Sequence, residues 1–104
     1  MLDHAREAVE MIQGRTREDV DRDRQLNLSL VRLLEIIGEA AARVSLSQQQ
    51  RLSSIPWPEV IGLRNRLIHG YDQVDFDILW DVIQIDLPSL IAKLEIVLNP
   101  TADK

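Results

Sequence analysis

The stretch from Leu63 to Tyr71 gathers the side chains of this sequence that are best suited to acid–base and anion chemistry. Arg64 offers a planar, permanently charged guanidinium that matches the geometry of a phosphate group. His69 carries an imidazole, the side chain most easily poised to exchange a proton near neutral pH. Asn65 follows the arginine directly, and Tyr71 adds a phenol two residues after the histidine. An arginine and a histidine together suit phosphodiester chemistry, because one can stabilise developing charge while the other moves a proton.

The spacing of these residues predicts a site at the end of a helix. Arg64 and His69 are five positions apart, which places them about 140° apart around a helix axis, while Asn65 lies one turn before His69 on the same face. Gly70 is typical of the residue that follows a helix, so we expect His69 in the last helical turn and Tyr71 on the next loop. The alternative is a helix cap with solvated surface charges, which composition alone favours because short motifs often match by chance.

The pattern Arg64-x-x-x-x-His69-x-Tyr71, with a polar residue after the arginine, resembles the signature of the HEPN superfamily and in particular of its HepT-like toxin family. Three further blocks stand in the order and at the approximate spacing that this family shows. They are residues 34–41 (Leu-Glu-Ile-Ile-Gly-Glu-Ala-Ala), Ile55-Pro56-Trp57 and Asp86-Leu87-Pro88. The resemblance therefore covers nearly the whole chain, from Leu2 to about Leu98.

The resemblance implies an all-α fold, an up-and-down four-helix bundle that forms a homodimer and brings two copies of the motif together across one cleft. It also implies a metal-independent endoribonuclease, the toxin of a type VII-like toxin–antitoxin pair, that cleaves RNA with Arg64 and His69 as catalytic residues. In this interpretation His69 takes the proton from a ribose 2′-hydroxyl or returns one to the leaving oxygen, and Arg64 stabilises the charge that develops around phosphorus. Asn65 would position the phosphate or the imidazole, and Glu39 would orient Arg64 or His69.

By the same resemblance, Tyr71 accepts AMP from a cognate nucleotidyltransferase antitoxin of the MntA type. The added phosphate would place negative charge in the cleft that must receive RNA. Tyr71 could also cap the helix end, and the two roles are compatible. Arg66 lies outside the family signature and is either an auxiliary phosphate contact or a plain surface charge. A second function stays open: a non-catalytic HEPN module that docks a minimal nucleotidyltransferase, since an acidic surface suits a basic protein partner.

Composition limits these possibilities. The chain has 104 residues, of which 45% are hydrophobic and 28% charged, a size and balance typical of a single globular domain. Its net charge of −5 is not typical of a general nucleic-acid binder. Residues 64–69 nevertheless hold two arginines and no acid, so positive charge can be local. We therefore expect weak and selective RNA binding, or dependence on a partner.

The sequence suggests neither a cofactor nor a membrane. Cysteine is absent, which excludes disulfides and thiolate metal sites. The stripe formed by Arg32, Glu35, Glu39 and Arg43 is a poor metal set without a nearby histidine, and we interpret it as a ladder of ion pairs. No apolar run approaches the ~20 residues that span a bilayer, and the N-terminus does not have the build of a signal peptide. We expect a cytoplasmic protein.

Apolar residues recur at helical spacing along the whole chain. The pattern predicts four main helices, over residues 2–13, 25–45, 58–69 and 76–97, in one domain with a loose tail at 99–104. We expect Trp57 to be buried at the start of the third helix. The helix at 25–45 is apolar on two sides, and Gly38 and Ala42 would let another helix approach closely, so we expect one side to form a dimer interface.

Local signals refine these helix boundaries. Thr16 and Asp19 are spaced as a capping box, and Asp75 is a suitable N-cap for the last helix. Pro88 lies inside that helix and should kink or break it near Leu87, because proline lacks the N–H that the helix needs. Residues 48–52 could form one helical turn. The sequence shows no repeat, no glycine-rich phosphate loop and no strand-like alternation.

Overall fold

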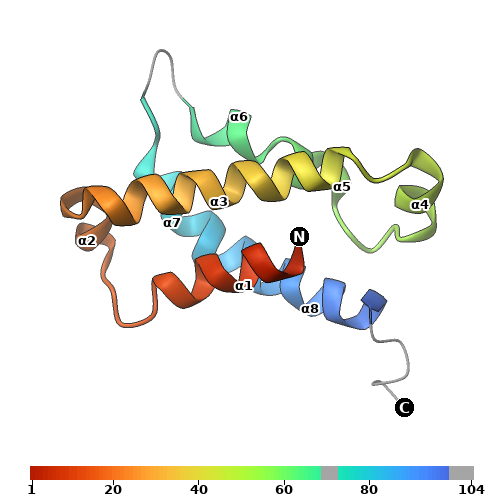
Figure 1. The fold of residues 1–104 in the computed structure, drawn as a ribbon, viewed down its shortest axis with the longest axis horizontal. Coiled ribbons are helices and arrows are strands. Elements are labelled where there is room, and N and C mark those ends of the chain that lie inside the picture. Colours follow the sequence, from red (N-terminus) through yellow and green to blue (C-terminus); the bar gives the residue numbers. More distant parts are fainter. Residues whose placement is uncertain (69–72, 99–104) are drawn as a thin grey trace.

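A computed structural model describes residues 1–68 and 73–98 of the chain. Residues 69–72 and 99–104 lie outside the described residues, and the second range is the tail predicted to be loose. Within the described residues the chain is helical apart from short connections, and its only β pairing is an isolated antiparallel bridge between Ile68 and Val74. The predicted all-α fold class is confirmed (Figure 1).

The helical elements follow one another closely along the chain. They are α1 (Leu2–Met11), α2 (Arg17–Arg22), α3 (Arg24–Ala42), α4 (Leu46–Arg51), α5 (Trp57–Ile61), α6 (Leu63–Leu67), α7 (Phe76–Asp81), the π-helix η1 (Val82–Asp86) and α8 (Leu87–Leu98). Figure 1 shows four segments that run in alternate directions, namely α1, α3, the pair α5–α6, and the continuous run α7–η1–α8. This arrangement matches the predicted up-and-down bundle, whereas the predicted homodimer stays a prediction.

The helix α3 is the central element of the domain. It packs against α1 and α2, and it also contacts α5, α6 and α7. Leu30, Leu34 and Ile37 are fully buried along its inner side. The second apolar side that the sequence predicts is only partly covered by the same chain: Ala41 is buried, whereas Leu28 is 52% exposed. An apolar position of α3 is therefore left at the surface.

Gly38 determines how closely α5 approaches α3. A Cβ atom at this buried position would lie 3.2 Å from the carbonyl oxygen of Val60 and 3.3 Å from that of Ile61. Those carbonyl groups belong to the backbone, so they cannot move aside without moving α5. The predicted close approach at Gly38 is confirmed, and the helix that approaches is α5 of the same chain. Ala42, the second small residue of that prediction, is exposed.

The predicted helix caps are confirmed. The hydroxyl of Thr16 accepts from the backbone N–H of Asp19 at 3.3 Å, and the Asp19 carboxylate accepts from the N–H of Thr16 at 2.8 Å. The carboxylate of Asp75 accepts from the N–H groups of Asp77 and Ile78 at 2.9 and 3.1 Å, and α7 begins at the next residue. These caps satisfy donors that the first turn of a helix cannot pair internally.

Pro88 disturbs the last helical segment as predicted, but the chain does not leave the helical path. The five residues before α8 form the π-helix η1, and α8 continues from Leu87. Because Pro88 has no N–H, the α-helical bond to the carbonyl four residues earlier cannot form. The longer π-type spacing changes the helical register directly before this position, and such turns are frequent at functional sites.

The prediction of one motif helix over residues 58–69 is wrong in two respects. The segment is divided at Gly62 into α5 and α6, and α6 ends at Leu67 instead of His69. Ile68 is extended, with φ −96° and ψ 123°, and it forms the β-bridge with Val74. The N–H of Asp75 donates to the carbonyl of Leu67 at 2.7 Å. This pairing with the returning chain ends the helix before Gly70, the glycine expected to follow its last turn.

Candidate functional site

The short helix α6 presents three consecutive polar side chains to solvent. Leu63 and Leu67 are 3% and 0% exposed and fix one side of the helix in the core. Arg64, Asn65 and Arg66 between them are all exposed. Successive helical residues are about 100° apart, so the two arginines lie on opposite sides of α6 with the amide on the outer crest.

The two arginines differ in their partners. Arg66 donates from Nη1 to Oδ2 of Asp86 in η1 at 3.1 Å. Arg64 forms no hydrogen bond or ion pair with any residue of the described ranges. The arginine of the predicted signature is thus the one whose guanidinium has no partner within residues 1–68 and 73–98.

The supporting residues Asn65 and Glu39 are not brought into contact with Arg64. The side chain of Asn65 has no hydrogen-bond partner among the described residues. Glu39 is exposed on α3, where one carboxylate oxygen lies 3.8 Å from Nη1 of Arg32. Although α3 and α6 pack together, the carboxylate of Glu39 lies near Arg32, which is on the same helix α3. The predicted supporting roles of both residues stay predictions.

His69 and Tyr71 lie outside the described residues. The described residues on the two sides of this segment are Ile68 and Gln73, and the bridge between Ile68 and Val74 holds both ends together beside the end of α6. Their predicted roles as catalytic residue and modification site therefore stay predictions. The described chain does fix where the segment starts, directly after the helix that carries Arg64.

The ladder of ion pairs predicted for the polar stripe on α3 forms only in part. Arg32 pairs with Glu35 at 3.4 Å, one turn along the helix, as well as with Glu39. Arg43 is exposed and forms no ion pair with the described part of the chain. In residues 1–68 and 73–98, no three side chains of the His, Cys, Asp or Glu type come together as a metal ion would require.

Trp57 is a core residue. Its side chain is only 6% exposed, and its indole N–H donates to the carbonyl of Leu52 at 3.1 Å. The ring thus fixes the connection between α4 and α5, as predicted, and is not available for stacking on a base. Ser45 also caps α4 by accepting from the N–H of Gln48, which confirms a short helix near residues 48–52.

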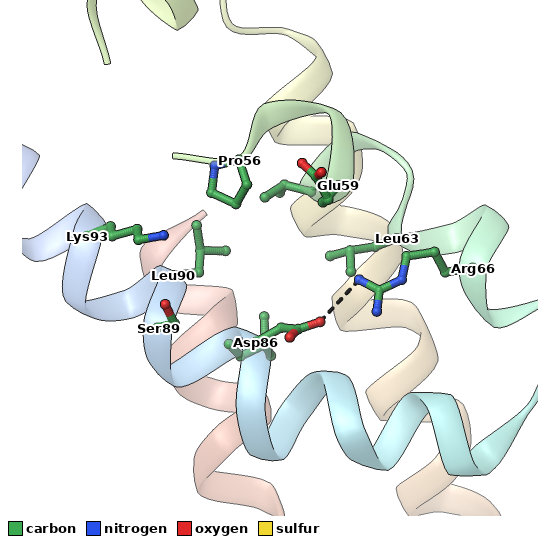
Figure 2. Close-up of a pocket in the computed structure, with 10 residues that line it drawn as sticks. Pro56, Glu59, Leu63, Arg66, Asp86, Ser89, Leu90 and Lys93 are labelled. Atoms are coloured by element: carbon green, nitrogen blue, oxygen red, sulfur yellow. Dashed lines mark hydrogen bonds and ion pairs between the residues drawn. The ribbon is translucent and has the colours of Figure 1, made fainter. Parts of the chain in front are cut away.

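A groove of about 400 Å³ lies on the Arg66 side of α6. We call it the Arg66 groove. It is lined by Pro56, Glu59 and Val60 from α5 and the residue before it, Leu63 and Arg66 from α6, and Asp86, Leu87, Ser89, Leu90 and Lys93 from η1 and α8 (Figure 2). In the sequence, Asp86 stands out only as part of a family block, and Lys93 belongs to no motif. Residues 66 and 86 are far apart in the sequence, and no local spacing rule connects them.

No helix in the described part of the chain has the length and apolar character needed to cross a lipid bilayer.

The paired arginines elsewhere on the surface, such as Arg6 with Glu95 at 2.9 Å and Arg15 with Asp23 at 3.3 Å, form ordinary exposed ion pairs. Arg64 and Lys93 differ from these because neither has an ionic partner among residues 1–68 and 73–98.

Comparison with known proteins gives one consistent result. The model of the family described as ribonuclease HepT-like matches residues 1–97. A Thermococcus cleftensis protein whose name assigns it to ribonuclease HepT is 38% identical over 98 residues, covering 90% of this chain and 89% of that protein. Proteins named as RNases in Methanocaldococcus jannaschii and Caldanaerobacter subterraneus are 31% and 35% identical, over 93% and 88% of this chain and 89% and 81% of their own lengths. No solved structure is significantly similar to the chain.

Proposed function

Because the chain belongs to the HepT-like ribonuclease family, we propose that it is an endoribonuclease that cleaves RNA with Arg64 and His69. The observation that carries this proposal is the state of Arg64, which is exposed on α6 and has no partner in the described chain. An exposed surface arginine without a carboxylate partner can meet a phosphate without first losing an existing bond. The names of the relatives supply the class of substrate, which is RNA.

The proposed reaction needs proton transfer at two oxygens. The ribose 2′-oxygen attacks phosphorus while the bond to the 5′-oxygen of the next nucleotide breaks. His69 takes the proton of the 2′-hydroxyl, and a second imidazole or a water molecule gives a proton to the leaving oxygen. Arg64 stabilises the negative charge on the non-bridging oxygens during the displacement. Asn65 lies on the crest of α6, from where its amide can donate to the same phosphate.

A homodimer would supply the second imidazole. Two copies of the motif across one cleft would place one His69 on each side of the scissile bond. The exposed Leu28 supports a partner surface on α3, because an apolar side chain that is 52% exposed gains from being covered. In this proposal the dimer is needed for chemistry and not only for stability.

Cleavage of an unstructured RNA in excess EDTA tests the proposed activity. We expect the wild-type protein to cut and both His69→Ala and Arg64→Ala to lose activity, while Arg51→Ala, another exposed arginine without a described ionic partner, stays active. EDTA also tests the proposed independence from metal ions. A wild-type protein that leaves RNA intact, or a His69→Ala variant that cuts as fast as wild type, would contradict the proposal.

The proposed regulation is the transfer of AMP to Tyr71 by a nucleotidyltransferase antitoxin, as in a type VII-like toxin–antitoxin pair. The nucleotide would bring a phosphate close to Arg64 and compete with RNA for the same cation. Intact-protein mass after incubation with ATP, magnesium and the candidate nucleotidyltransferase should increase by one AMP unit in wild type and not in Tyr71→Phe. An equal increase in both proteins would exclude Tyr71 as the acceptor.

The alternative is a non-catalytic module that docks a nucleotidyltransferase. The net charge of −5 favours this alternative, because an acidic surface suits a basic protein at least as well as RNA. The EDTA assay separates the two functions. A docking module would bind the nucleotidyltransferase tightly and show the same lack of cleavage with and without the His69→Ala change.

A further inference from the structure

The Arg66 groove has a charge pattern that the proposed reaction does not use. Figure 2 shows Arg66 and Lys93 at opposite ends of the groove, with Leu63 and Leu90 between them. Val60 and Leu87 add to the apolar lining. Along its length, the groove therefore has a cationic side chain at one end, an apolar surface in the middle and a second cationic side chain at the other end.

Both cationic side chains have N–H donors left to bind an anionic ligand. Arg66 uses a single N–H, from Nη1, for its bond to Asp86 at 3.1 Å, and a guanidinium carries five such donors. Lys93 forms no hydrogen bond or ion pair with any described residue, although its side chain is partly covered in the groove. Its ammonium group has three donors to offer. Ser89, also in the lining, adds a hydroxyl.

We propose that the Arg66 groove binds a nucleotide of the RNA strand that lies next to the cleaved bond. The phosphates on the two sides of this nucleotide would bind to Arg66 and Lys93, and its nucleoside would lie over Leu63 and Leu90. Every internal nucleotide of a strand has a phosphate on each side of its sugar, which matches two cations separated by an apolar surface. The position relative to the cleaved bond rests on the proposed ribonuclease function, whereas the binding itself does not.

The path of the strand follows from the exposed residues of α6. Arg64, Asn65 and Arg66 are consecutive and exposed, so they form a polar track across the outer side of the helix. A strand with one phosphate at Arg64 can cross this track and enter the groove at Arg66. The groove thus extends the contact surface beyond the signature residues to a neighbouring nucleotide.

Electrostatics favour this path over the rest of the surface. The whole chain has a net charge of −5, whereas the groove lining holds two cations and two carboxylates, Glu59 and Asp86. Asp86 is already paired with Arg66, and Arg64 adds a positive charge on the same helix that has no partner within residues 1–68 and 73–98. Glu59 opposes a third phosphate near the α5 side and so restricts the phosphates to the two ends of the groove.

Binding of a 2′-O-methyl RNA octamer, which cannot be cleaved through its 2′-oxygen, tests the groove without any cleavage. Fluorescence anisotropy of the labelled octamer should show affinity for Lys93→Gln that is roughly three- to fivefold weaker than for wild type, the worth of one exposed ionic contact. The slope of log K against log salt concentration should become shallower by about 0.7, because one phosphate contact is lost. Lys93→Arg should bind as wild type does, and Arg51→Gln, which removes an equal charge outside the groove, should leave the slope unchanged.

A 2′-O-methyl dinucleotide provides the length control. It has a single phosphate, which can bind only one of Arg64, Arg66 and Lys93 at a time, so Lys93→Gln should weaken its binding less than it weakens binding of the octamer. An unchanged affinity and salt slope for the octamer in Lys93→Gln would overturn the proposal, as would a wild-type protein that binds no octamer. A loss of ATP binding in Lys93→Gln with unchanged octamer binding would also overturn it, since the groove would then hold a free nucleotide.

The binding result separates this proposal from the proposed activity. A protein that binds the octamer through Lys93 but leaves natural RNA uncut refutes the ribonuclease function and supports the groove. A protein that cuts RNA and binds the octamer equally well with and without Lys93 supports the ribonuclease function and refutes the groove.

Discussion

The two sides of α6 carry the same type of side chain in different states. Arg64 on one side is exposed and has no partner in the described chain, whereas Arg66 on the other is bonded to Asp86 at 3.1 Å. One residue separates them in the sequence, and the buried Leu63 and Leu67 anchor the opposite side of α6 in the core. The difference arises because only the Arg66 side faces η1. A guanidinium without a described partner suits charge stabilisation at a reacting phosphate, while one that uses a single N–H for Asp86 keeps its other donors for a neighbouring phosphate.

The largest effect should come from removing Arg64. In Arg64→Ala we expect kcat/KM for RNA cleavage to fall roughly 10³-fold, about 4 kcal/mol in the activation barrier, because the charge on the phosphate oxygens loses its cation. The free energy of unfolding should change by less than ~0.5 kcal/mol, since the side chain that is removed is exposed and has no partner among the residues that the structure describes. Steady-state cleavage and urea unfolding of the same preparation measure both values.

Arg66→Ala is the matched control for this change. It removes the same group from the same helix, yet its effect on kcat/KM should stay below roughly tenfold, because Arg66 contacts a neighbouring phosphate and not the reacting one. Equal losses of activity in the two variants would show that the sides of α6 are functionally equivalent. In that case, the pairing of Arg66 with Asp86 would not distinguish its function from that of Arg64.

The second largest effect concerns the anchor that both sides share. Leu67 is fully buried, so Leu67→Ala should lower the free energy of unfolding by about 3 kcal/mol through lost contacts and a cavity. Ile61, which is 38% exposed at the end of α5, is a suitable comparison, and its change to alanine should cost under ~1.5 kcal/mol. Urea unfolding measures both. A tolerant Leu67 would mean that α6 does not depend on the core for its position.

The elements that could be predicted from the sequence are those set by neighbours along the chain. The Thr16 and Asp75 caps depend on donors at most three residues away, and the buried side of α3 follows from its own periodicity. The end of α6 could not be predicted in this way. It is set by the bond from Asp75 to Leu67 and by the bridge at Ile68, and the local glycine signal pointed two residues too far.

The candidate site shows the same limit. The signature identified Arg64 and Asn65 as candidate site residues, and the structure leaves both exposed on α6. It could not show which arginine is paired, because the partner Asp86 is 20 positions from Arg66 in a π-helical turn that no periodicity rule predicts. The Arg66 groove is built from two stretches of the chain, residues 56–66 and 86–93, so only the fold brings its lining together.

We expect Gly38→Ala to have a smaller effect on stability. The substitution would displace α5, and with it α6, which follows α5 directly in the chain. The new Cβ would lie 3.2 Å from the Val60 carbonyl oxygen, and relieving this contact requires α5 to move. Overpacking costs of ~2 kcal/mol, offset by ~1 kcal/mol from the better helix propensity of alanine, leave a net loss of about 1 kcal/mol. Activity and groove binding should fall together. A variant more stable than wild type would show that α5 adjusts freely and does not fix the position of α6.

The smallest effect should be the stability contributed by the pair that distinguishes the two sides. Arg66 and Asp86 are 43% and 46% exposed, so a double-mutant cycle with Arg66→Gln and Asp86→Asn should give a coupling free energy of only ~0.5 kcal/mol, further reduced by salt. Asp86→Asn alone should instead strengthen RNA binding, since it frees the guanidinium for phosphate. A coupling above ~2 kcal/mol would mean that the pair holds α6 to η1 structurally, and weaker RNA binding in Asp86→Asn would mean that the carboxylate orients Arg66 toward the strand. Our proposal requires both a weak coupling free energy between Arg66 and Asp86 and stronger RNA binding in Asp86→Asn, because the phosphate of the RNA would then compete with Asp86 for the guanidinium.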